Sequence, residues 1–237
     1  MKKILFVLLI IYSQGLYAQY DDEKQALVDI VIESVDLSYF EGDSLSSEQE
    51  KVVKIAEKIS PNKEHLSFIG IPINGDINTF QSKISSKGFR PYKELNQLVP
   101  NGIRAFRGDF AGEPANVIVF YNPQTKIVYK VRAAINKEDE ASKNRLVVRF
   151  ENAIKNNHNS PIEFENSNSF AKQTIFAILT KSKDYLTGTI NLFSNNESFN
   201  KDNKYYYSKS FNNYSIIVDY KDQTNYILHL QNLMKSF

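Results

Sequence analysis

Three histidines, His65, His158 and His229, are the first side chains to consider for acid–base chemistry, because the chain has no cysteine. None of them lies in an HExxH or H-x-H pattern, and no serine lies in a GxSxG pentapeptide. A Ser-His-Asp site is recognised by its geometry and not by spacing, so a hydrolase with a dispersed site stays open as an alternative. The lack of cysteine excludes a thiol nucleophile and a thiolate metal site.

Oxygen ligands for a hard cation are spaced three apart at Asp219, Asp222 and Asn225. The same spacing fits an ordinary strand-to-helix junction, in which Asp222 caps the final helix and Asn225 lies in its first turn. We favour the junction, because a calcium loop normally adds further carboxylates and a glycine. We therefore assign no metal ligands and no cofactor, and keep a metal-binding periplasmic protein as an alternative.

A second pair of acidic residues, Glu163 and Glu165, is separated by one residue. On a strand both carboxylates point to the same face, as an acid–base pair would require. A solvated strand face explains the same spacing equally well. We therefore assign no catalytic residue, and an enzyme is the less favoured interpretation.

Aromatic residues are abundant, with 14 Tyr, 16 Phe and no Trp. A Tyr-Tyr-Tyr run on a strand places rings on both faces, which is typical of a partner-binding or sugar-binding surface. Strands also favour aromatic residues for packing alone, and the lack of Trp weakens the interpretation as a sugar-binding surface. A second candidate is the irregular stretch 90–102, which can form the rim of a binding surface. The predicted binding surface comprises Arg90, Tyr92, Lys93, Tyr205, Tyr206 and Tyr207.

The element that positions residues 90–102 is a predicted helix beginning after Asp76, which is a suitable N-cap. Ile77, Phe80 and Ile84 share one face of it. Gly88 follows where a left-handed C-terminal residue belongs, and Phe89 supplies the apolar contact of such a cap. We therefore predict positive φ at Gly88.

Two further helices are predicted from periodicity. The first lies within 44–60, where Ser47 and Glu50 have capping-box spacing and Pro61 ends the pattern. The second begins near Asp139 and carries an apolar stripe centred on Phe150. We predict that Phe150 is buried.

Strand-like runs occupy most of the remainder, and in one of them, 126–135, Tyr129, Val131 and Ala133 are expected to face the same way. The other predicted strands are 66–73, 103–110, 117–121, 174–180, 186–193, 204–208 and 214–220. A last helix follows. This order, α-βαβββ-αβββ(β)-α, predicts an α+β fold of antiparallel sheet with helices packed on one face.

The N-terminus has the three parts of a cleavable signal peptide over residues 1–18. Lys2 and Lys3 precede an apolar run, and Ala18 offers a small residue at the cleavage site. The run is shorter than the roughly 20 residues of a membrane-spanning helix. We therefore expect a periplasmic or secreted protein that begins near Gln19 and, lacking cysteine, is not a lipoprotein.

Charge narrows the class of partner. Of 29 Lys and Arg, Lys2 and Lys3 belong to the predicted signal, which leaves 27 basic residues against 27 Asp and Glu. A balanced chain argues against nucleic acid, which selects a basic surface, and against an anionic membrane surface. No segment after the signal approaches the length of a membrane span, so we expect no membrane insertion after signal cleavage. The expected partner is a protein or a small molecule.

The run "FIGIPINGDINTFQSKISSKGF" over 68–89 resembles a family of exported bacterial proteins of unknown function. Their members carry a similar G-[IV]-P-I-[DN]-G and a short helix ending in K-G-F. The runs "LVVRFENAIKNNHNSP", "GTINLF" and "YSIIVDYKDQTN" are similar to later elements of the same family. The resemblance implies export and a layout similar to β-lactamase-inhibitor-like and PepSY-like modules, and it carries no activity.

The resulting domain prediction has three parts: the signal peptide 1–18, an N-terminal extension 19–65 with one helix, and an α+β domain 66–237. The last divides into two similar halves, 66–135 and 136–237. The expected function is that of an exported, non-enzymatic binding or interaction protein.

Overall fold

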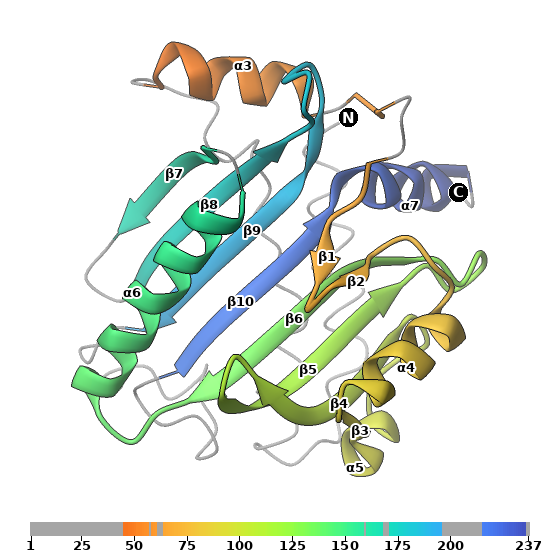
Figure 1. The fold of residues 1–237 in the computed structure, drawn as a ribbon. Helices are drawn as coiled ribbons and strands as arrows, with labels where there is room; N and C mark the ends of the chain where they lie inside the picture. Colours follow the sequence, from red (N-terminus) through yellow and green to blue (C-terminus); the bar gives the residue numbers. More distant parts are fainter. Residues whose placement is uncertain are drawn as a thin grey trace.

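The computed structural model describes residues 45–56, 58–60, 64–158, 160–167, 171–195 and 215–235. The predicted signal peptide, Tyr205, Tyr206, Tyr207 and the predicted strand 204–208 lie outside these residues. The described chain is α+β, as predicted, and is built around an eight-stranded antiparallel sheet (Figure 1).

Two antiparallel meanders make the sheet. The first consists of β3 (Arg90–Pro91), β4 (Ile103–Phe110), β5 (Glu113–Tyr121) and β6 (Val128–Asn136). The second consists of β7 (Ile162–Ser167), β8 (Ala171–Leu179), β9 (Leu186–Asn195) and β10 (Ser215–Asp222). The last strand of each meander pairs with the other, which gives the order β3-β4-β5-β6-β10-β9-β8-β7.

Helices α4 (Ile77–Ser86) and α6 (Glu140–Asn157) cover one face of this sheet, with the hairpin of β1 (Ser67–Phe68) and β2 (Ile71–Pro72) between them (Figure 1). The prediction of helices on one face holds for these two. It is wrong for α3 (Ser47–Ile55), whose Val52 packs in a separate cluster with Phe164 and Ile175 on the opposite face.

The two remaining helices, α7 and α5, lie at the margins of the sheet. Helix α7 (Gln223–Lys235) follows β10, and the ring of its His229 stacks on Tyr129 at 4.2 Å between centroids. The one-turn helix α5 (Lys93–Asn96) lies beside β4, within the stretch predicted to be irregular. The 90–102 stretch is therefore more ordered than predicted.

The main core lies between the sheet and helices α4 and α6. Phe150 of α6 is only 4% exposed, which confirms its predicted burial, and its ring stacks on Phe110 at 5.4 Å. Phe110 in turn stacks on Phe68 of the hairpin at 5.2 Å. Aromatic contacts thus join α6, β4 and the hairpin into one unit.

The ends of α4 follow the predicted local chemistry. Asp76 accepts from the backbone N–H groups of Asn78 and Thr79, as an N-cap does. Gly88 has φ of +94°, and the N–H groups of Gly88 and Phe89 donate to the carbonyls of Ser85 and Ile84. This is a Schellman motif, so the prediction for Gly88 is confirmed.

Three local predictions are wrong. The predicted strand 66–73 is a hairpin, because Ile69 and Gly70 both have positive φ and turn the chain back on itself. The capping box uses Ser46 and Gln49 in place of Ser47 and Glu50, since the same spacing recurs one residue earlier. The third wrong prediction placed Tyr129 on the same face of its strand as Val131. The register between β5 and β6 shifts at Phe120 and Tyr121, so Tyr129 packs with Phe120 and not in the main core that contains Val131.

None of the helices within the described ranges is both long and apolar enough to cross a membrane.

Candidate functional site

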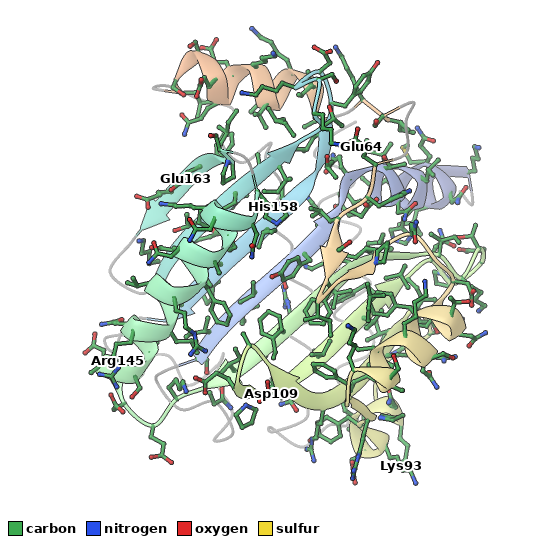
Figure 2. All side chains as sticks on the ribbon, in the orientation of Figure 1. Glu64, Lys93, Asp109, Arg145, His158 and Glu163 are labelled. Atoms are coloured by element: carbon green, nitrogen blue, oxygen red, sulfur yellow. The ribbon has the colours of Figure 1, made fainter. Side chains whose placement is uncertain are left out.

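A cavity of about 360 Å³ lies at the end of the sheet where α4, α5, β4 and β5 meet. Its polar walls come from Gln81, Asn96, Asn101, Arg104 and Tyr121. Val99, Pro100 and Ile103 supply apolar walls. We call this cavity the Arg104 pocket. Figure 2 labels Lys93 on α5, at the same end of the molecule.

Arg104 is the one charged side chain among the described residues that line the pocket. It lies two residues before Phe106 on β4, so strand alternation points it to the same face, toward α4. Its Nη1 donates to Gln81 Oε1 at 2.5 Å and to Asn78 Oδ1 at 3.3 Å. Both partners are neutral amides. Within the described part of the chain no ion pair includes Arg104, so no carboxylate there neutralises its charge.

The loop that closes the pocket is held by side-chain bonds to neighbouring strands. Asn96 clamps β4, since its Nδ2 donates to the Ala105 carbonyl at 2.8 Å and its Oδ1 accepts from the Ala105 N–H at 2.7 Å. Gly102 has φ of +106°, and a Cβ there would lie 3.1 Å from the Tyr121 carbonyl oxygen. A side chain at this position would be strained by the positive φ and would crowd this carbonyl, so glycine is favoured. The Tyr121 hydroxyl donates to Asn101 Oδ1 at 3.1 Å and fixes the loop tip to β5.

The electrostatic environment of the pocket is positive. The Arg104 guanidinium lies 5.9 Å from the centre of the Tyr121 ring, and Lys126 Nζ lies 5.8 Å from it. Tyr121 is buried, so this ring holds two cations near one wall. The pocket lining therefore combines one cation, Arg104, with several amide groups, and Lys126 adds positive charge only near the Tyr121 wall.

Of the predicted binding residues, the three that the structure describes, Arg90, Tyr92 and Lys93, do not line this pocket. Arg90 and Lys93 are exposed, and Tyr92 is half-buried beneath Arg107, whose guanidinium is 3.3 Å from the ring centre. The prediction did not include Arg104, Gln81 or Tyr121, which line the pocket. One signal in the sequence points to Arg104: it is a charge in the row of β4 that otherwise carries Phe106 and Phe110.

A histidine–carboxylate pair lies elsewhere, at the junction of β10 and α7. His65 Nδ1 is 3.0 Å from Asp222 Oδ2, and this fully buried carboxylate also accepts from the N–H groups of Leu66 and Asn225. This confirms Asp222 as the cap of the final helix. Two members of a hydrolase triad are present in this pair. Among the residues that the structure describes, no hydroxyl hydrogen-bonds to His65.

His229 has a structural environment. Asn122 Oδ1 accepts from the N–H groups of Gln124 and Thr125, so its Nδ2 donates to His229 Nδ1 at 3.2 Å. Burial lowers the pKa of His229 to about 4. The ring is therefore neutral near pH 7 and packs against Tyr129. Burial also lowers the pKa of His158, the residue that ends α6.

A buried ionic cluster joins β6 to β10. Asp219 accepts from Arg132 through two bonds, at 2.6 and 2.7 Å, and lies 2.9 Å from Lys130 Nζ. The three side chains are at most 5% exposed. Burial alone would raise the pKa of Asp219, but the charges of Arg132 and Lys130 hold it below its ordinary value. Burial lowers the pKa of Lys130 to about 8, against the opposing effect of Asp219.

The other acidic candidates also have partners. Asp219 and Asp222 lie three apart on one strand and so point to opposite faces, which prevents them from sharing a cation. Glu163 and Glu165 pair with Lys155 and Lys172 at 3.0 and 3.7 Å. Over the described ranges no three His, Asp or Glu side chains converge as a metal site.

Comparison with known proteins found no match among protein-family models, curated proteins or solved structures. The resemblance to exported proteins of unknown function therefore stays a prediction.

Proposed function

We propose that this chain is an exported, non-enzymatic binding protein whose ligand occupies the Arg104 pocket. The observation that carries this proposal is that Arg104 has no carboxylate partner among the described residues. A half-buried guanidinium faces a cavity, and among the described residues it donates to the neutral oxygens of Gln81 and Asn78 alone. A guanidinium without a carboxylate partner in the described chain can receive an anion from outside.

The lining of the pocket supports binding in preference to catalysis. It consists of amides, one phenol, one guanidinium and three apolar side chains, with no carboxylate, histidine or serine among the described lining residues. A cavity with a few convergent polar groups on an apolar wall is the usual form of a ligand site. The fixed loop, held by Asn96 and Asn101, suits a preformed site of this kind.

The second candidate is an exported hydrolase centred on His65, favoured by its contact with the buried carboxylate of Asp222. If Asp222 is ionised, it accepts the proton of Nδ1 and leaves Nε2 of His65 as a base. The pair also has a structural explanation, since Asp222 caps α7 and fixes the Leu66 backbone. That explanation accounts for the bonds that Asp222 accepts from Leu66 and Asn225.

A ligand screen tests the proposal directly. The chain purified after export is screened by thermal shift against small polar compounds, in parallel with Arg104→Gln. We expect hits that stabilise the unchanged chain and not the variant. Compounds that stabilise the unchanged chain and Arg104→Gln equally would show that they bind outside the Arg104 pocket. Ester or peptide hydrolysis that disappears in His65→Ala would favour the hydrolase.

Export is tested separately, by N-terminal sequencing of the mature protein. The expected first residue is Gln19 or a close neighbour. A cytoplasmic protein that retains Met1 would contradict export and leave the pocket assignment unaffected.

A further inference from the structure

The hydrogen-bonding groups that face the Arg104 pocket are mostly donors. Gln81 Oε1 and Asn101 Oδ1 are occupied as acceptors by Arg104 and the Tyr121 hydroxyl. The amide NH₂ groups of these two residues have no bond among the described residues. Asn96 donates one N–H to the Ala105 carbonyl and accepts from the Ala105 N–H, which anchors its amide to β4. Within the described chain, the amide N–H groups of Gln81 and Asn101 therefore have no bond, whereas the oxygen of each of these amides already accepts one.

Arg104 adds the largest group of donors. A guanidinium has five N–H groups in a planar fork, and the bonds from Arg104 to Gln81 and Asn78 both come from Nη1. Its Nη2 and Nε have no partner among the described residues. Two such N–H groups side by side match the two oxygens of a carboxylate.

From these groups we infer that the Arg104 pocket binds a small organic monocarboxylate with an apolar tail. The inference rests on the proposed binding function and names its ligand class. The carboxylate lies against Arg104, with the amide groups of Gln81 and Asn101 as further donors. The tail lies against Val99 and Ile103, which are both partly buried.

Charge and size separate this ligand from other anions. Arg104 is the single cation among the described lining residues, and Lys126 lies only near the Tyr121 wall. One guanidinium neutralises a monoanion, whereas a phosphate dianion normally takes several cations or a helix N-terminus. An apolar wall also has no counterpart on inorganic phosphate. A cavity of about 360 Å³ accommodates a molecule of metabolite size.

A matched acid and amide test the inference by calorimetry. The probes are 4-methylpentanoate and 4-methylpentanamide, which differ in charge but hardly in shape, with inorganic phosphate as a third probe. We expect the acid to bind at least tenfold more tightly than the amide and the phosphate, because it alone carries a bidentate negative charge and a tail. Arg104→Gln is expected to remove this preference.

The control variant is Arg107→Gln, which removes an exposed arginine of the same strand that stacks on Tyr92 and does not line the pocket. We expect it to leave binding of the acid unchanged. Equal binding of acid and amide, both lost in Arg104→Gln, would overturn the ligand class and keep the binding site. Tighter binding of phosphate would overturn the class in the same way. A screen in which no compound depends on Arg104 would overturn the binding function itself.

Discussion

Two arginines on neighbouring parts of one sheet have opposite environments. Arg132 on β6 is 3% exposed and makes two bonds to the carboxylate of Asp219. Arg104 on β4 is half-buried, faces a cavity and bonds to neutral amides. The charge of Arg132 is compensated within the fold, whereas that of Arg104 has no carboxylate partner in the described chain.

The difference separates a structural charge from a binding charge. A buried cation that loses its anion destabilises the protein strongly, because the remaining charge is still out of water. A cation at the mouth of a cavity stays partly hydrated, so its removal costs little stability. The two sites should therefore respond differently to the same change in charge, and the following predictions test this.

The largest effect is expected for Asp219→Asn. This change removes the anion that accepts from Lys130 and Arg132 in a buried site. The free energy of unfolding should fall by about 3–5 kcal/mol, measured by chemical denaturation. Glu165→Gln is the control, because this exposed carboxylate lies 3.7 Å from Lys172 and should contribute under about 1 kcal/mol. Equal losses in the two variants would contradict a structural role for the cluster.

The second prediction concerns pH. Burial lowers the pKa of Lys130 to about 8 from 10.5, so between these values the unfolded chain holds a proton that the folded chain has released. Stability should then rise with pH, by on the order of 1 kcal/mol per unit between pH 8.5 and 9.5. Above this window Tyr220, whose pKa burial raises to about 12, begins to oppose the rise, because only the unfolded tyrosine ionises.

Denaturation of the unchanged chain and of Lys130→Met across this pH range measures the slope. The variant should lack the Lys130 contribution. An identical slope in both proteins would show that Lys130 does not cause it.

A smaller effect is expected at Gly88, which follows the C-terminal end of α4 and does not line the Arg104 pocket. Gly88→Ala should lower stability by about 1 kcal/mol, since alanine disfavours the left-handed backbone found there. No atom lies within 4 Å of a Cβ built at this position, so the cost is conformational and not steric. Gly88→Asn should cost less, because asparagine tolerates this geometry. Binding of the carboxylate probe should be unchanged in both, which would separate stability from binding at this end of the molecule.

Local chemistry predicted the positions of several elements from the sequence. Asp76 at one end of α4, and Gly88 and Phe89 at the other, each bond to residues at most five positions away, so their pattern identified both ends of the helix. The burial of Phe150 followed from helical periodicity. These features were predictable because they depend on neighbours in the chain.

Features that depend on pairing between strands were missed. Tyr129 lies outside the main core because the register between β5 and β6 shifts beside it. The alternation of apolar and polar residues within 126–135 gives no sign of this shift. The Arg104 pocket joins Gln81, Arg104 and Tyr121, which are far apart in the sequence. The sequence-based prediction named Arg90, Tyr92 and Lys93, because irregular segments often carry binding residues. The pairing of β4 with β5 brings Arg104 near Tyr121, and the packing of α4 on the sheet adds Gln81.

The most direct test compares Arg104→Gln with Arg132→Gln, which are the same change in the two environments. For each variant, stability is measured by chemical denaturation and binding of 4-methylpentanoate by calorimetry. We predict that Arg104→Gln loses binding at least tenfold with a stability change under about 1 kcal/mol. Arg132→Gln should lose about 3 kcal/mol or more of stability, because Asp219 loses both bonds to this guanidinium. An Arg104→Gln variant that is as destabilised as Arg132→Gln, or that binds the probe as tightly as the unchanged chain, would contradict the assignment of Arg104 as the binding charge.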